Sequence, residues 1–275
     1  VGYQQGLVGV EHFVLVAGSR EDRSVGPFAA AEDVVAGVAC NDVVARVAGE
    51  HVRVVVAGQR RAVGAGQRRP GEVLRAVSVD GRLVMGEAAK GLKPTTLELG
   101  GKSPLIVFED ADLDNAVSGA MMANFYSTGQ ICSNGTRVFV HRSVLKDFLA
   151  RLEKRTKALR IGDPFNPETH IGPLVSATQL DLVLGHIARA RREGVKLLMG
   201  GERLTGGEYD RGFYVEPTVF DGVTDDMVIG REEIFGPVLG LIRYSDDEDM
   251  IAKANDTRYG LASGLWTNDM ERAMR

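Results

Sequence analysis

Residues 103–129, SPLIVFEDADLDNAVSGAMMANFYSTG, combine a short apolar run with a longer segment whose apolar residues recur at helical spacing. The run SPLIVFED (103–110) has the length and composition of a buried strand, and the Ala, Val and Met spacing over 111–129 predicts a helix. Asp110 or Asp112 is the expected N-cap, because an Asp side chain accepts hydrogen bonds from the first free backbone N–H groups of a helix. The stretch therefore predicts one β-α step.

A second step follows at once. RVFVHRS (137–143) alternates like a strand, and VLKDFLARLEKRTKAL (144–159) predicts a helix. The apolar residues of that helix fall largely on one face, as a helix packed on a sheet requires. These residues are Leu145, Phe148, Leu149, Leu152 and Leu159.

Strand and helix signals continue to alternate toward the end of the chain. Residues 176–194 predict a helix with Ser176 as its N-cap and Gly194 as its stop, followed by a strand over 195–201. A strand over PVLGLIRYS (237–245) and a short helix over DDEDMIAKAND (246–256), with acidic residues in its first turn, complete the series. Alternation of this kind predicts an α/β domain with a mainly parallel sheet and flanking helices.

The first part of the chain has a different composition. Residues 1–89 contain no Lys, Thr or Ile, and Val, Ala, Gly and Arg dominate them. Periodicity is weak there, so residues 1–80 are left unassigned. We interpret the segment as translation in a wrong reading frame or across a rearranged junction, because Lys and Ile codons are AT-rich. A genuine, unrelated N-terminal domain is the alternative.

Composition narrows the function classes. The formal net charge of -4 gives no electrostatic reason to expect a nucleic-acid partner, since phosphate binding needs a basic surface. The sequence contains no run of about 18 apolar residues, which is the length that would predict a membrane span. Two cysteines, Cys40 and Cys132, favour a reducing compartment over a disulfide framework, and the first residues do not resemble a secretion signal. A cytoplasmic protein that acts on a small molecule is expected.

Cys132, in TGQICSNGTR (128–137), is the residue on which a chemical function depends. A thiol in this setting is either an inert, buried small side chain or a nucleophile, and its neighbours alone do not decide between the two. Glu98 stands in LELGGKSP, where Gly100 and Gly101 permit a tight turn after a strand-like segment. Taken alone, Glu98 is more simply a solvated turn residue.

Two other kinds of site are rejected. GGKS (100–103) echoes the end of a phosphate-binding loop, but the first glycine of that motif is missing because position 96 is Thr. The histidines show no metal-ligand spacing, so no metal site is proposed. They stand at positions 12, 51, 141, 170 and 186.

Four stretches carry a resemblance to a known family: KGLKPTTLELGGKSPLIVFEDADLDNAV (90–117), ANFYSTGQICSNGTRVFVHRS (123–143), IGDPFNPETHIGPLVS (161–176) and REEIFGPVLGLIRYSDDEDMIAKANDTRYGLASGLWTND (231–269). Together they resemble the NAD-dependent aldehyde dehydrogenases, and the sequence around Cys132 is most similar to that of betaine aldehyde dehydrogenases. The resemblance covers about residues 81–275. It implies that 81–98 end a dinucleotide-binding domain and that 99–275 form a C-terminally truncated catalytic domain.

The resemblance also implies a mechanism. Cys132 would attack the aldehyde carbon, hydride would pass to NAD, and Glu98 would activate the water that hydrolyses the resulting thioester. The Cys132 backbone N–H would stabilise the oxyanion, and Gly100 would leave room for the nicotinamide. Glu233 would bind a cofactor ribose, and Phe235 would lie against the nicotinamide. A small aldehyde would be the substrate, and members of the family are homo-oligomers.

The chain departs from the family pattern before Glu98. The family carries there a Pro-Trp-Asn stretch with a second oxyanion donor and a lysine that meets the adenosine ribose. In this chain the only tryptophan is Trp266 and the first lysine is Lys90. Two alternatives to an active dehydrogenase therefore stay open: a catalytically silent remnant, and a weak thiol esterase that needs no NAD.

Overall fold

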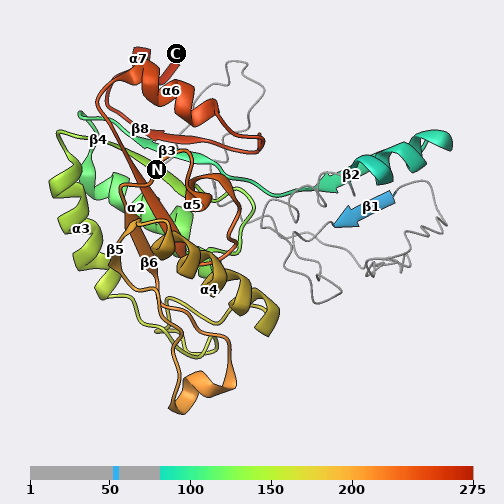
Figure 1. Cartoon of the computed structure of the whole chain (residues 1–275), viewed down its shortest axis with the longest axis horizontal. Helices are drawn as coiled ribbons and strands as arrows, with labels where there is room; N and C mark the ends of the chain where they lie inside the picture. Colours follow the sequence, from blue (N-terminus) through green and yellow to red (C-terminus); the bar gives the residue numbers. More distant parts are fainter. Residues whose placement is uncertain (1–51, 56–80, 275) are drawn as a thin grey trace, which may run out of the picture. The chain divides into compact units, whose positions relative to one another are not determined.

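The computed structural model describes residues 52–55 and 81–274 (Figure 1). The chain divides into two compact units, and the boundary falls between Leu99 and Gly100. The hypothesis about residues 1–80 lies outside the described residues, apart from one short strand.

The unit that ends at Leu99 contains a parallel strand pair. β1 (Val52–Val55) pairs with β2 (Thr95–Glu98), and Val52 is in register with Thr95. Residues 81–90 are helical, and Lys93 N–H donates to the carbonyl of Ala88, 3.0 Å away, as the chain leaves that helix. The assignment of 81–98 to a dinucleotide-binding domain stays a prediction.

The unit that begins at Gly100 is built on a sheet in the order β5-β6-β7-β4-β3-β8. Every neighbouring pair is parallel except β5 and β6, which confirms the mainly parallel sheet. The strands are β3 (Pro104–Val107), β4 (Arg137–His141), β5 (Lys196–Met199), β6 (Thr218–Asp221), β7 (Val238–Tyr244) and β8 (Gly264–Trp266). β6 and β8 were not predicted from the sequence; they pair with β7 and β3, contacts that leave no local signal.

Helices cover both faces of this sheet (Figure 1). Val138 and Val140 of β4 pack with residues of α2 and α3, whereas Phe139 between them packs with residues of α4, α5 and α6. The alternation follows from the pleat of a strand buried on both faces. The helices are α2 (Leu113–Phe125), α3 (Leu145–Lys157), α4 (Ala177–Arg192), α5 (Val228–Arg231), α6 (Asp247–Asn255) and α7 (Met270–Met274), with short 3-10 turns η1 (Tyr126–Gly129) and η2 (Gly207–Arg211).

The predicted helix signals are largely confirmed. Ser176 caps α4 by accepting from the backbone N–H of Gln179 at 3.1 Å, and Gly194 follows the helix with a φ of 82°. Phe148 and Leu152 of α3 are fully buried, as their helical spacing predicted. Each of α4 and α6 therefore begins and ends within about two residues of the boundaries expected from caps and breakers.

Asp112, and not Asp110, caps α2. Its carboxylate accepts from the backbone N–H groups of Asp114 and Asn115, at 3.0 and 3.1 Å. Asp110 instead accepts from the Thr267 hydroxyl at 2.8 Å and from the Asn268 backbone N–H at 2.8 Å. The two carboxylates thus serve different elements: one begins a helix, and the other ties the end of β3 to the end of β8.

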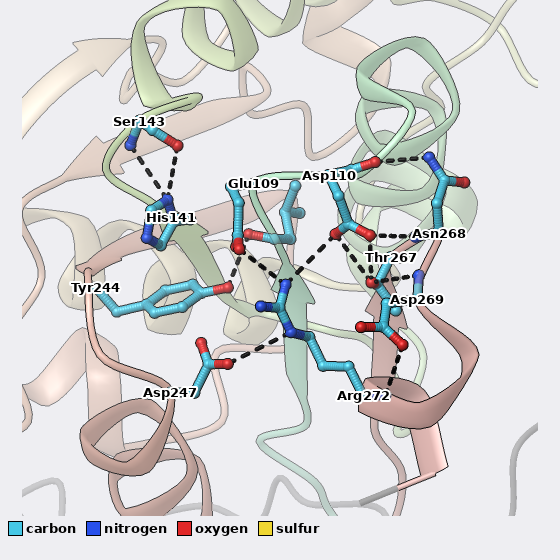
Figure 2. Close-up of polar contacts among 11 residues, drawn as sticks. Glu109, Asp110, His141, Ser143, Tyr244, Asp247, Thr267, Asn268, Asp269 and Arg272 are labelled. Carbon is cyan, nitrogen blue, oxygen red and sulfur yellow. Dashed lines mark hydrogen bonds and ion pairs between the residues drawn. The ribbon is translucent and has the colours of Figure 1, made fainter.

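Arg272 of α7 adds to the connection between the ends of β3 and β8 (Figure 2). Its guanidinium lies 2.9 Å from Glu109 and 3.5 Å from Asp247, and it stacks over the Phe108 ring at 4.9 Å from the ring centroid. The network lies where β3, β7 and β8 end, so charged and aromatic side chains fill that edge of the sheet. The segments that carry the predicted site lie at the opposite edge.

Arg137, the first residue of β4, joins three segments through a buried guanidinium. It donates to the carbonyls of Lys102, Lys253 and Ala254, at 2.9, 3.1 and 2.7 Å. The last two carbonyls belong to the final turn of α6, where backbone donors are scarce because the helix ends there. One side chain therefore connects the segment before β3, the start of β4 and the end of α6.

Arg137→Met should destabilise the fold strongly, because the carbonyls of Lys102, Lys253 and Ala254 lose the charged donor that joins their segments. We expect the free energy of unfolding to fall by about 3 kcal/mol or more in urea denaturation. Arg151→Met is the matched control, since it removes an exposed ion pair with Asp114 and should cost about 1 kcal/mol or less. Equal losses in the two variants would contradict the role given to Arg137.

Candidate active site

In the unit that begins at Gly100, the predicted site residues lie on segments that directly precede neighbouring strands of the sheet. Gly100 precedes β3, Cys132 precedes β4, and Glu233 and Phe235 precede β7. Because β7, β4 and β3 are adjacent and parallel, these segments meet at the amino-terminal edge of the sheet. The topology therefore brings together residues that are far apart in the sequence.

Glu233 lies directly against the Gly100–Gly101 backbone. Its Oε1 accepts from the Gly101 N–H at 3.2 Å. A Cβ atom placed on Gly100 would come within 2.1 Å of Glu233 Oε2, which is far inside a contact distance. Only glycine at position 100 leaves the carboxylate where it is.

The second glycine lies against the nucleophile candidate. A Cβ atom on Gly101 would come within 2.4 Å of the carbonyl oxygen of Cys132. The Cys132 thiol is free and the residue is half-buried. Partial exposure beside a glycine pair does not match a sealed core thiol, and a reactive cysteine needs such access.

The turn before Cys132 corrects the predicted end of the preceding helix. The sequence predicted a helix to residue 129, but α2 ends at Phe125. Ser127 and Thr128 then take left-handed backbone conformations, with φ of 53° and 57°. The Thr128 hydroxyl donates to the Gly172 carbonyl at 3.1 Å, and such a long-range contact has no local signal.

A side-chain hydrogen bond ties this turn to the segment that leads into α4. The Val175 N–H donates to Gln130 Oε1 at 2.9 Å. Gln130 lies just before Cys132 on one segment, and Val175 directly precedes the N-cap Ser176 on the other. The nucleophile candidate is therefore positioned relative to the start of α4.

Glu98 closes β2 in the other unit, where its side chain is exposed. Its role as a base stays a prediction. Phe235 is half-buried and has a φ of 55°, a left-handed conformation that is unusual for a bulky residue.

Lys102 is a buried ionisable residue that the sequence argument missed, since it was weighed only as part of a phosphate-binding loop. Only 1% of it is exposed, and Nζ has no hydrogen-bond partner among the described residues. Burial, together with the nearby Arg137 charge, lowers the pKa of Lys102 to about 7, while Glu233 and Glu232 oppose the shift. The sequence signal was a lysine next to a glycine pair, which by itself does not indicate burial.

The neighbouring carboxylates and a histidine share this environment. Burial raises the pKa of Glu233, and the Gly101 N–H and the Lys102 charge oppose that shift. Burial also raises the pKa of Glu232. Burial, with the Lys102 and Arg189 charges, lowers the pKa of His186 to about 4. The edge is therefore an environment that disfavours charge, which is typical of functional sites.

Within residues 52–55 and 81–274, no three His, Cys, Asp or Glu side chains are gathered closely enough to hold a metal ion. Each helix in the same part of the chain is too short or too polar to cross a membrane.

Comparison with known proteins gives a consistent result. The model described as "Aldehyde dehydrogenase family" matches residues 77–275. A betaine aldehyde dehydrogenase of Brucella ovis is 55% identical over 194 residues, which cover 70% of this chain and 39% of that protein. The chain thus spans about two fifths of the length of the curated relatives it matches.

Solved structures agree. An aldehyde dehydrogenase from Bacillus cereus, solved as an NAD+ complex, is 38% identical with a TM-score of 0.70, covering 82% of this chain and 41% of that one. HpcC from Thermus thermophilus is 44% identical with a TM-score of 0.67, covering 71% of this chain and 39% of that one. Both similarities confirm the fold predicted for the unit that begins at Gly100.

Stability should depend on pH through Lys102. Its pKa is lower in the fold, about 7, than the ordinary value of 10.5, so between these values the unfolded chain binds more protons. The free energy of unfolding of the wild type should therefore rise with pH in this window, by about 1.4 kcal/mol per unit relative to Lys102→Met. Urea denaturation at a series of pH values above neutrality measures this slope.

Lys157→Met serves as the control for that slope. Its ammonium forms an exposed pair with Glu153 at 2.6 Å, so the variant should keep the pH dependence of the wild type. A Lys102→Met protein with an unchanged slope would show that Lys102 does not titrate in this window.

Proposed function

The chain belongs to the aldehyde dehydrogenase family, and we propose that it carries the catalytic part of an NAD-dependent aldehyde oxidation. The observation that supports this proposal is the meeting of Gly100, Gly101, Cys132 and Glu233 at one edge of the sheet. These residues come from three segments that the family resemblance had singled out. In the proposal, Cys132 is the nucleophile and Glu98 is the base.

The Cys132 sulfur, as thiolate, attacks the carbonyl carbon of the aldehyde and forms a thiohemiacetal. The backbone N–H of Cys132 stabilises the oxyanion that develops. NAD, when bound, supplies the acceptor for the hydride that leaves this carbon. The thioester left on Cys132 is then attacked by water whose proton passes to Glu98, and the acid departs as the thiolate is regenerated.

The residues present fit the nicotinamide half of the cofactor. Gly100 has no side chain beside Glu233, and the Glu233 carboxylate has two oxygens, of which one accepts from the Gly101 N–H. The other oxygen is suited to accept from a ribose hydroxyl. Phe235 precedes β7 on the same segment and would place an apolar ring near the nicotinamide.

Betaine aldehyde is the proposed substrate, because Brucella relatives named betaine aldehyde dehydrogenase are 55% identical to this chain over 194 residues. Assembly into homo-oligomers and a cytoplasmic location, both expected from the sequence, remain proposals for this chain.

Formation of NADH from NAD and betaine aldehyde tests the function. We expect activity in the wild type and none above background in Cys132→Ala, whereas Glu98→Gln should lower the rate by about a hundredfold or more. Hydrolysis of a simple ester, with NAD omitted, separates the alternatives. Hydrolysis that depends on Cys132 without NADH formation would indicate a thiol esterase, and the absence of both activities would indicate a silent remnant.

Gly100→Ala should displace Glu233 and weaken NAD binding. The added methyl group would collide with the carboxylate of Glu233, so we expect the KM for NAD to rise by about tenfold or more. Gly185→Ala, in the exposed middle of α4, is the control, because an added Cβ there meets nothing within 4 Å. An equal change of KM in the two variants would contradict the role assigned to Gly100.

A further inference from the structure

Gln179 lies in the first turn of α4, is completely buried, and binds the segment that carries Phe235. Its Nε2 donates to the carbonyls of Ile234 and Phe235, at 3.1 and 2.6 Å. Both partners are acceptors, so the bonds are made by the amide nitrogen of Gln179 and not by its oxygen. These bonds reach across 55 and 56 residues of sequence.

The segment bound by Gln179 has a conformation that it would not adopt by itself. Phe235 has a φ of 55°, which costs energy for a residue with a Cβ atom and persists only where the surroundings impose it. The hydrogen bonds from Gln179 hold the carbonyl groups of Ile234 and Phe235, which flank the Cα atom of Phe235. Together with the packing described next, they restrict the orientation of this segment.

Close packing on both sides restricts the same segment. A Cβ atom on Gly236 would come within 2.5 Å of Val183 Cγ2, one turn farther along α4. A Cβ atom on Gly129 would come within 2.1 Å of the Gly236 carbonyl oxygen. Residues 234–236 are therefore held between α4 and the turn that leads to Cys132.

The start of α4 thus contacts the segments of both predicted functional groups. Gln179 binds the Phe235 segment, and Val175, just before the helix, binds Gln130 near Cys132. We propose that Gln179 is a positioning residue that fixes the Phe235 ring relative to the Cys132 thiol. Its effect on catalysis rests on the proposed function, whereas its effect on the Phe235 segment does not.

Hydrogen exchange measured by mass spectrometry tests the structural part without NAD. Gln179→Met keeps the volume of the side chain but cannot donate, so the amides of 232–236 should exchange about tenfold faster than in the wild type. Asn124→Leu is the matched control: Asn124 is also fully buried and donates to two carbonyls, those of Ala120 and Gly135. This control should leave exchange at 232–236 within about twofold of the wild type.

The proposal is overturned if Gln179→Met leaves exchange at 232–236 unchanged, or if the control accelerates it equally. A second measurement asks whether Gln179 acts through Phe235. In the full chain, Gln179→Met should raise the KM for NAD by about tenfold, but by no more than about twofold when Phe235→Ala is already present. Equal effects in both backgrounds would exclude an action through the ring.

The two proposals can fail separately. If the wild type forms no NADH, the proposed dehydrogenase activity is wrong for this chain, and the exchange measurement alone decides the role of Gln179. If NADH forms and exchange is unchanged in Gln179→Met, the proposed function stands and the positioning role is wrong.

Discussion

The arrangement of the unit that begins at Gly100 depends on the hydrogen bonds that the Arg137 guanidinium donates. A single cation buried at the start of the central strand binds the carbonyl after the glycine pair and two carbonyls at the end of α6. Buried carbonyls without donors are costly, and a charged donor serves several of them at once. The segment before β3 is therefore held at the start of β4, and the close approaches made by Gly100 and Gly101 follow from that placement.

Close backbone packing gives this edge its chemical character. Because the glycines have no side chains, Glu233 reaches the backbone of one segment and the Cys132 carbonyl reaches the same segment from the other side. Burial of the two groups lowers the pKa of Lys102 to about 7 and raises the pKa of Glu233. At the other edge, Arg272 and its acidic partners form a compact ion-pair network. The two edges of one sheet thus have different roles: one presents a glycine-lined site, and the other connects the final strand and helix.

Much of the fold could be predicted because its signals are local. Ser176 and Gly194 bound α4, and the apolar spacing of α3 gave its buried face. The signals failed where distant contacts decide the structure. β6 and β8 are strands only because they pair with β7 and β3, and α2 ends early where Thr128 binds Gly172. Asp110 and Asp112 were equivalent as caps by sequence, and the partners Thr267 and Asn268 distinguish them.

The sequence by itself determined the alternation of the longer strands and helices. It also determined the family and the choice of Cys132, Gly100, Glu233 and Phe235 as candidate groups. Periodicity, caps and motifs are properties of neighbouring residues. Only the tertiary structure decided which of the candidate groups meet. Gly101 and Glu233 are 132 residues apart, Lys102 and Arg137 are 35 apart, and Gln179 and Phe235 are 56 apart. No local pattern records such pairs, because burial and hydrogen bonding between distant segments depend on the parallel order of the strands. The same reason explains why Lys102, Arg137 and Gln179 were missed: a polar side chain gains its role only when the fold buries it beside its partners.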